Sequence, residues 1–209
     1  MSYRPTQKTE ERKKSQRTLI LNSALKLLIE KGFLNLTIAA VAEEAEVATG
    51  TVYKYFESKT TLCTDVFKLG GELELRYVRN TVFPEGVLPG ERSCKKRLLD
   101  VITMFAERAL GNYRLAYAML AEPIDPMIEV ERLNYRRAFT HTLAALIDEG
   151  IEAGEFCQQD SSVTASALVG ALSETMLGPM GASEPDAFSC DHQILIESIK
   201  SFSERAVSM

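Results

Sequence analysis

The sequence predicts an all-α protein in which a small N-terminal head of three helices is joined to a larger C-terminal helical bundle. Apolar residues recur at helical spacing along most of its 209 residues. No run alternates apolar and polar residues between hairpin turns, as a half-buried strand would. Glycine and proline fall mainly where the helical pattern stops, which is where they end helices. The predicted division is a head of residues 1–60 and a bundle of residues 61–209.

The first predicted helix spans residues 10–31 and ends before Gly32, a residue suited to the left-handed backbone of a C-terminal cap. Beyond this cap, Phe33 and Leu34 are expected to fold back onto an apolar stripe of the helix. The stripe consists of Leu19, Ile20, Ala24, Leu27 and Leu28.

Thr37 is expected to cap a short second helix over residues 38–45, because its hydroxyl can accept a hydrogen bond from a free amide of the first turn. Glu46 and Val47 form a tight turn. A third short helix follows at residues 49–55 and completes the head.

Ser58 is expected to cap a long helix over residues 59–78, which is followed by a loop rich in glycine and proline at residues 83–90. Further glycines and prolines separate the remaining helices of the bundle. These are predicted at residues 93–110, 112–121, 126–153, 161–180 and 190–207.

Residues 37–62, TIAAVAEEAEVATGTVYKYFESKTTL, have the spacing of a helix-turn-helix, in which the second helix enters the major groove of DNA. The exposed side of that second helix offers hydroxyl, phenol and ammonium groups for phosphate oxygens and base edges, and a glycine that permits close backbone approach. For its two tyrosines, half-buried packing beside Phe56 is the alternative. The residues are Thr49, Gly50, Thr51, Tyr53, Lys54 and Tyr55.

This stretch resembles the TetR/AcrR family of repressors. The family signature has a threonine that opens the second helix, a Gly-Thr-hydrophobic-Tyr recognition helix, and a Tyr-Phe-x-Ser-Lys motif that opens the fourth helix. Here these positions are Thr37, residues 50–53 and residues 55–59, within a resemblance that covers residues 14–62.

The resemblance implies a homodimeric repressor that binds a palindromic operator in double-stranded DNA and is released by a small-molecule effector of unknown identity. It implies phosphate contacts from Thr37, Thr51, Tyr55 and Lys59. It also implies that four residues of the recognition helix face the bases or their adjoining backbone. They are Thr49, Gly50, Tyr53 and Lys54.

Two positions depart from the family pattern. Glu46 stands where the turn usually has glycine, and a positive φ there would cost on the order of 1 kcal/mol. Ala48 stands where a serine or threonine usually caps the recognition helix, so Thr49 is expected to take over the capping.

The charge distribution favours DNA binding by the head although the net charge is −5. Residues 1–62 hold ten Lys or Arg against seven Asp or Glu, a net of +3, which leaves 14 basic and 22 acidic residues, a net of −8, in the remainder. The basic residues of the N-terminal tail are either an arm that reaches DNA or part of a solvated leader. They are Arg4, Lys8, Arg12, Lys13 and Lys14.

For the bundle, the resemblance implies effector binding and dimerisation. Three helices, at residues 93–110, 112–121 and 126–153, carry aromatic, methionine and arginine residues that suit an apolar cavity with a few polar groups. Plain core packing explains the same residues equally well. The candidate effector-binding residues are Met104, Tyr113, Tyr117, Arg132, Tyr135, Arg136 and Phe139.

The last two helices are expected to form a dimer interface, because small residues such as Ala167 and Gly170 allow close packing. A bundle packed within one chain is the competing interpretation. The apolar residues expected in the seam are Leu168, Val169, Leu172, Met176, Leu177, Ile194, Leu195, Ile199 and Phe202.

Other function classes lack support in the sequence. There is no glycine-rich phosphate loop, nucleophile elbow, paired-histidine motif or carboxylate cluster, so we expect no catalytic residue, metal or cofactor, and an enzyme or a helical adaptor is a weaker interpretation. No apolar run suits a membrane span, and the polar N-terminus does not suit a secretory signal, so we expect a cytoplasmic protein. Four scattered cysteines are expected to be reduced: Cys63, Cys94, Cys157 and Cys190.

Overall fold

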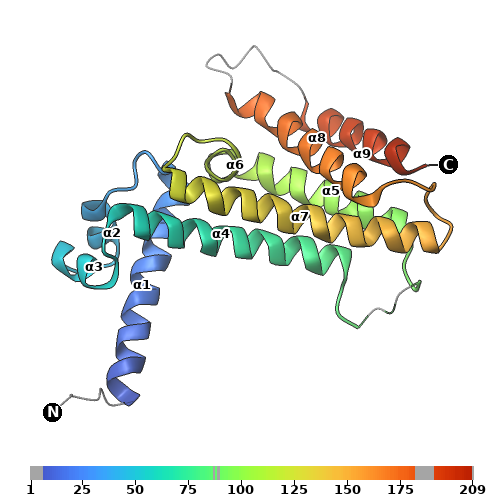
Figure 1. Ribbon diagram of the computed structural model, residues 1–209. Helices are drawn as coiled ribbons and strands as arrows, with labels where there is room; N and C mark the ends of the chain where they lie inside the picture. The colour runs from blue at the N-terminus through green and yellow to red at the C-terminus, as the bar shows by residue number, and fades with distance from the viewer. Residues whose placement is uncertain (1–6, 87, 89, 182–190, 209) are drawn as a thin grey trace. The chain divides into compact units, whose positions relative to one another are not determined.

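The computed structural model describes residues 7–86, 88, 90–181 and 191–208, and every regular element within these ranges is an α-helix (Figure 1). The all-α prediction is therefore confirmed. The helices are α1 (Gln7–Lys31), α2 (Ile38–Glu44), α3 (Thr49–Tyr55), α4 (Lys59–Val82), α5 (Cys94–Gly111), α6 (Tyr113–Leu120), α7 (Pro126–Glu152), α8 (Ser161–Gly181) and α9 (His192–Val207).

The helices pack into two compact units. Unit 1 contains the described residues up to Gly70 together with Pro123–Glu131, and unit 2 contains Gly71–Glu122 and the described residues from Arg132 onward. Two helices, α4 and α7, therefore contribute residues to both units.

In unit 1, the apolar face of α1 is buried, and α1 packs against α2. Ile20, Ala24, Leu27 and Leu28 of the predicted stripe are buried, but Leu19 is exposed and its assignment to the stripe is wrong. Successive residues of a helix point about 100° apart, so a stripe centred on the other four residues leaves Leu19 at its edge.

The chain beyond α1 turns at Gly32, whose φ of 74° confirms the left-handed cap. Phe33 is buried and its ring stacks on that of Phe67, with the ring centroids 6.1 Å apart. Leu34 is exposed, so the expectation that it folds back onto α1 is wrong.

Unit 2 has one apolar core, to which all of its helices contribute. Phe105 of α5 and Phe139 of α7 pack against each other there, with ring centroids 5.3 Å apart. This core anchors the helices that carry the cavity described below.

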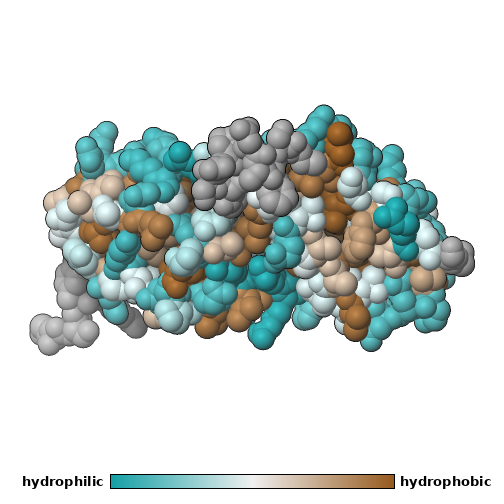
Figure 2. Space-filling view, turned by 90° about the horizontal axis from the view of Figure 1, so that it is seen from above, coloured by the Kyte–Doolittle hydropathy of each residue, from teal (hydrophilic) through white to brown (hydrophobic). Residues whose placement is uncertain are grey.

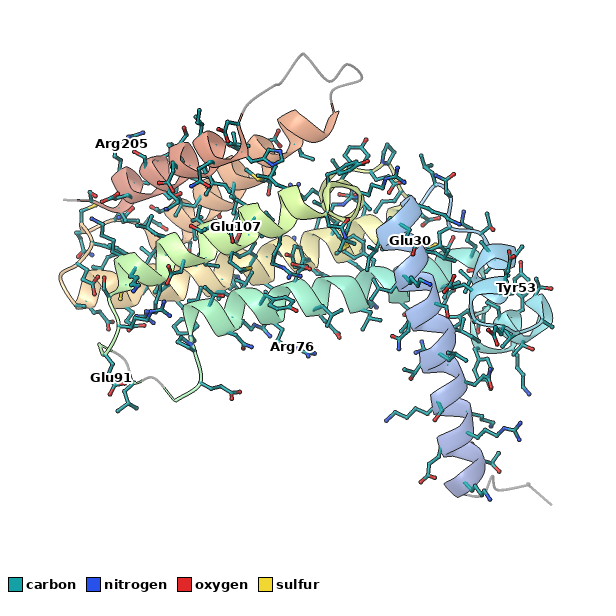
Figure 3. The ribbon with its side chains drawn as sticks, turned by 180° about the vertical axis from the view of Figure 1, so that it is seen from behind. Glu30, Tyr53, Arg76, Glu91, Glu107 and Arg205 are labelled. Carbon is teal, nitrogen blue, oxygen red and sulfur yellow. The ribbon has the colours of Figure 1, made fainter. Side chains whose placement is uncertain are left out.

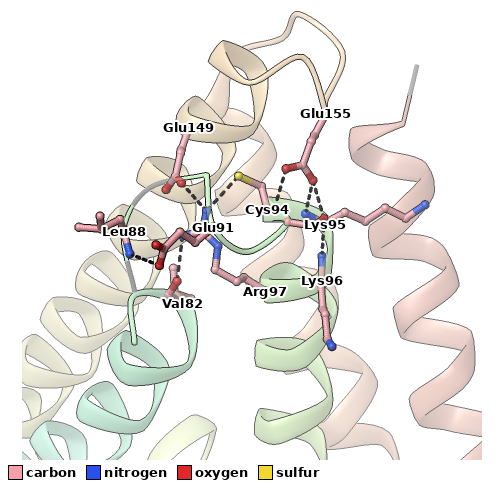
Figure 4. A network of polar contacts seen from close by, with 10 residues as sticks. Val82, Leu88, Glu91, Cys94, Lys95, Lys96, Arg97, Glu149 and Glu155 are labelled. Carbon is pink, nitrogen blue, oxygen red and sulfur yellow. Dashed lines mark hydrogen bonds and ion pairs between the residues drawn. The ribbon is translucent and has the colours of Figure 1, made fainter. Parts of the chain in front are cut away.

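The N-terminus of α5 is fixed by a network of polar contacts (Figure 4). The buried guanidinium of Arg97 donates to the Val82 carbonyl at 3.2 Å, to Cys94 Sγ at 3.0 Å and to a Glu149 carboxylate oxygen at 2.5 Å. A buried charge is tolerated when it is paired and hydrogen-bonded in this way. The network therefore joins the end of α4, the start of α5 and the end of α7.

Of the nine apolar residues expected in a seam between two chains, five are buried, two (Leu177 and Leu195) are half-buried against the core of unit 2, and two are exposed. Leu168, Val169, Leu172, Met176 and Ile199 are buried in the core of unit 2, which favours the single-chain interpretation for these five. Ile194 and Phe202 of α9 remain exposed, as does Val163 of α8.

Within the described residues, none of the helices combines the length and the apolar character that crossing a membrane requires. Cys63, Cys94 and Cys157 are free thiols, and Cys190 lies outside the described residues.

Candidate functional site

The two short helices of unit 1 have the bounds and the cap expected of a helix-turn-helix. Thr37 caps α2 as predicted, because its hydroxyl accepts a 3.1 Å hydrogen bond from the amide of Ala40. α3 spans the predicted residues, and Val52 on its inner face is fully buried against the head. Burial of that inner face fixes which side of α3 points outward.

The turn between α2 and α3 closes by two backbone hydrogen bonds. The amide of Glu46 donates to the carbonyl of Glu43 at 3.1 Å, and the amide of Val47 donates to that of Ala42 at 2.9 Å. This is the Schellman arrangement, which requires a left-handed residue between the two helices. Glu46 takes that role with a φ of 52°, so the strain anticipated at this position is present.

The start of α3 has no side-chain cap. Ala48 is the N-cap residue, with extended backbone angles, and it offers no side-chain oxygen. The expectation that Thr49 caps the helix is wrong. Thr49 is the first residue inside the helix, and the capping geometry belongs to the residue before the first turn.

The outer face of α3 stands clear of the protein. Tyr53 is 55% exposed, and Figure 3 shows it at the outer surface of the small helices. Thr49, Gly50 and Lys54 are also exposed, and a Cβ built on Gly50 would meet no atom within 4 Å. Thr51 and Tyr55 are half-buried. The exposure of Tyr53 disfavours the packing alternative for this residue, whereas the half-buried Tyr55 is compatible with it.

Two lysines near this face are available for an anion. Lys54 and Lys59 are exposed and have no ion-pair partner among the described residues. Two other cations of unit 1 are already paired. Lys26 lies 2.6 Å from a Glu44 oxygen, and its pKa is raised by that hydrogen bond. Arg17 pairs with Asp65 and lies over the ring of Phe56.

Thr37 is exposed at the start of α2, and Ser58 caps α4 as predicted, with its hydroxyl accepting a 3.0 Å hydrogen bond from the amide of Thr61. The head thus presents hydroxyl groups, a phenol and two unpaired ammonium groups around one short helix. Such a surface can bind phosphate oxygens and base edges.

Unit 2 contains a cavity of about 300 Å³ between α4, α5, α6 and α7. Its wall is mostly apolar, with polar groups from four residues. The apolar part comes from Phe105, Ala109, Gly111, Leu115, Ala116, Met119 and Leu120, and the polar part from Glu74, Arg108, Asn112 and Tyr135.

The two charged groups in this wall neutralise each other. Arg108 donates from Nε to one Glu74 oxygen at 2.9 Å and from Nη2 to the other at 2.5 Å. The guanidinium also lies 3.8 Å from the ring centroid of Tyr77. The hydrogen bond to Glu74 is the main reason that the pKa of Arg108 is raised. The opposite charges of the two side chains therefore compensate each other within the wall of the cavity.

Comparison with known proteins assigns both units to one family. The model of bacterial regulatory proteins of the tetR family matches residues 20–66, and the model of the tetracyclin repressor-like C-terminal domain matches residues 91–177. The chain belongs to the TetR family. The family resemblance seen in the sequence is thereby confirmed, and the chain is a DNA-binding transcriptional regulator.

Two curated relatives and one solved structure show the extent of this similarity. The fatty acid metabolism regulator protein of Bacillus subtilis (strain 168) is 24% identical over 160 residues, which cover 75% of this chain and 79% of that protein. The transcriptional repressor KstR of Rhodococcus jostii (strain RHA1) is 32% identical over 136 residues, 62% of either chain. The crystal structure of FadR from Bacillus subtilis in complex with stearoyl-CoA has the same fold, with a TM-score of 0.72 and 19% identity over 91% of this chain and 98% of that one.

Of the seven effector-binding candidates in this TetR-family protein, Tyr135 lies in the cavity wall. Arg132 instead donates to the carbonyl oxygens of Ala118, Met119 and Glu122, and so holds the end of α6. Arg136 donates to the Leu120 carbonyl, and Phe139 packs on Phe105 in the core. The remaining three candidates, Met104, Tyr113 and Tyr117, are not part of the wall.

Sequence reasoning missed Glu74 and Arg108. These residues are 34 positions apart, on helices that meet only in the folded chain. No local pattern marks such a pair, because charged residues at these positions are equally typical of a solvated helix face.

Proposed function

We propose that this TetR-family regulator is a homodimeric repressor that leaves a palindromic operator when a small molecule binds in the cavity of unit 2. In this proposal residues 1–60 bind DNA, residues 61–209 bind the effector and form the dimer, and the protein acts in the cytoplasm. The observation that carries it is the outer face of α3, which is exposed, polar and flanked by unpaired lysines.

At the operator, α3 enters the major groove of double-stranded DNA. Thr49, Gly50, Tyr53 and Lys54 face the bases or the adjoining backbone, and the exposure of all four supports this role. Phosphates are contacted from the flanks of the helix. The residues proposed for these contacts are Thr37, Thr51, Tyr55 and Lys59.

Dimerisation uses the surface that α8 and α9 leave uncovered. Val163, Ile194 and Phe202 are exposed there, beside the small residues Ala167 and Gly170. Figure 2 shows hydrophobic side chains among hydrophilic ones on the face over these two helices. A second copy would cover them and would place two recognition helices on two half-sites of DNA.

The cavity of unit 2 supports effector binding, since it is concave and mostly apolar with a few convergent polar groups. α4 contributes residues to both units, and it begins at Lys59 close after α3. A shift of α4 on effector binding would therefore change the presentation of α3. The effector releases the protein from DNA only if it binds the DNA-free state more tightly than the DNA-bound state.

A gel shift with DNA from upstream of the protein's own gene tests the proposal. The wild-type chain should retard this DNA, whereas Tyr53→Ala and Lys54→Ala should weaken binding by roughly tenfold, as expected for the loss of one base or phosphate contact. Lys96→Ala is the matched control, because it removes an exposed positive charge from unit 2 and should leave the shift unchanged. Failure of the wild-type chain to bind any duplex at low salt would overturn the proposal.

A further inference from the structure

The wall of the cavity in unit 2 includes a tyrosine hydroxyl that the protein itself leaves without a partner. Tyr135 is only 8% exposed, and its hydroxyl has no hydrogen-bond partner among the described residues. A buried hydroxyl without a partner costs free energy, so such groups are rare unless a ligand or a water completes them.

This hydroxyl opens toward the cavity. In the described part of the chain, the fully enclosed side-chain nitrogen or oxygen atoms without a partner are Arg97 Nε and Arg136 Nε. The Tyr135 oxygen is therefore partly accessible. Because Tyr135 lines the cavity, we infer that this accessible surface faces the cavity.

The hydroxyl remains a neutral donor. Burial is the main cause that raises the pKa of Tyr135 well above its ordinary value, and the Glu74 carboxylate raises it further, while Arg108 lowers it. A protonated phenol in an apolar cavity offers its hydrogen to an acceptor atom.

The other polar side chains of the wall each already have a partner within the protein. Glu74 and Arg108 bind each other through two hydrogen bonds, and the Asn112 side chain accepts from the amide of Leu115 at 3.2 Å. A carboxylate ligand would compete with Glu74 for the Arg108 guanidinium, and a cationic ligand would compete with Arg108 for the Glu74 carboxylate. In either case a partly buried charge would lose contact with its partner, which is unfavourable.

We propose that the cavity binds an uncharged, largely apolar molecule whose single oxygen acceptor receives a hydrogen bond from the Tyr135 hydroxyl. This inference rests on the proposed function, since it names the class of effector that the same cavity takes. Ketones, esters and similar carbonyl compounds belong to this class. A volume of about 300 Å³ is at the lower end of the range for ligand pockets, so the occupant is compact.

Isothermal titration calorimetry on the full-length chain tests the charge preference with three probes of equal chain length: octan-2-one, octanoate and octylamine. The ketone should bind more tightly than either charged probe. Glu74→Gln frees the Arg108 guanidinium, and this variant should raise the affinity for octanoate while leaving that for octan-2-one within about twofold. Tighter binding of octanoate than of the ketone to the wild-type chain would overturn the proposal, as would the absence of binding by all three probes.

Tyr135→Phe tests the hydrogen bond. Removal of this hydroxyl should weaken octan-2-one binding by roughly three- to tenfold, as expected for one neutral hydrogen bond. Tyr117→Phe is the matched control, because it removes a tyrosine hydroxyl outside the cavity wall and should leave the affinity unchanged. Unaltered ketone binding by Tyr135→Phe, in a chain whose thermal unfolding midpoint matches the wild type, would contradict the assignment.

Stearoyl-CoA is a further probe, since it is large and carries several negative charges. Binding of this molecule more tightly than octan-2-one, with no effect of Tyr135→Phe, would also contradict the proposal. A gel shift without any ligand tests DNA binding separately from the class of effector. Operator binding that is sensitive to Lys54→Ala keeps the regulator assignment even where the effector class proves wrong.

Discussion

The amide of Val47 donates a 2.9 Å hydrogen bond to the carbonyl of Ala42, across a turn in which Glu46 is forced into the left-handed region. Among the described residues, Glu46 is the one non-glycine residue with a positive φ. The turn that sets the angle between α2 and α3 therefore stores conformational strain.

Glu46→Gly should stabilise unit 1 by about 1 kcal/mol, because glycine adopts a positive φ without steric cost. Urea unfolding of both variants measures the difference. Glu43→Gly is the matched control: Glu43 is an exposed helical residue of α2, so the same substitution there should destabilise the chain by about 1 kcal/mol. A destabilising Glu46→Gly would show that the left-handed turn is not maintained in solution.

Ala48→Ser should stabilise α3 by about 0.5 to 1 kcal/mol, since it supplies the side-chain oxygen that the first turn of this helix lacks. The thermal unfolding midpoint should rise accordingly. Ala39→Ser, at an exposed position inside α2, offers no cap and should lower the midpoint slightly. An equal effect of both serines would mean that capping is not the cause.

Stability should fall in acid partly through Glu155. Burial raises the pKa of Glu155, but the hydrogen bonds from Ser93, Cys94 and Lys95 outweigh burial and lower this pKa below the ordinary value of 4.5. The ionised carboxylate caps the N-terminus of α5. Its contribution is therefore fully present above pH 4.5 and is lost as the pH falls through the lower pKa of the folded state.

Glu155→Gln should accordingly have a lower free energy of unfolding than the wild type at neutral pH. This difference between the two proteins should become smaller in acid. Urea unfolding at several pH values measures both quantities. Glu107→Gln, at an exposed position of α5, should show neither effect. A constant gap at all pH values would rule out titration of Glu155 as the source.

Phe202→Glu should convert the dimer into a monomer, because it places a charge on an apolar surface that a second copy is proposed to cover. Phe202 is 42% exposed on α9. Leu133→Glu on α7 changes a residue that is 45% exposed and should leave the dimer intact. Sedimentation velocity distinguishes the two states, and a wild-type chain that sediments as a monomer would overturn the proposed dimer.

Local signals predicted the head well. The bounds of α3 and the caps at Thr37 and Ser58 follow from side-chain chemistry within a few residues, which is why the sequence was sufficient. Thr49 was assigned wrongly because a shift of one position decides whether a hydroxyl can reach the first free amides of a helix.

The sequence indicated three of the helices that line the cavity, but not most of the residues in its wall. Tyr135 was among the candidates, but Arg132 and Phe139 have the same spacing on the same helix and serve the fold instead. Tyr135, Arg132 and Phe139 differ in the neighbours that surround each side chain in the folded protein. That depends on contacts between helices distant in the sequence, such as the one that joins Glu74 to Arg108.

The absence of a side chain at Gly71 determines how much room the proposed effector has. A Cβ at this position would lie 3.4 Å from Cδ2 of the Tyr135 ring and 3.7 Å from Cε of Met119, which is ordinary contact. A methyl group would therefore fit, whereas a branched side chain would push the phenol or the thioether into the space reserved for the occupant. A single codon change in α4 would thus alter which molecules fit the cavity, by moving side chains of its wall rather than by replacing any of them.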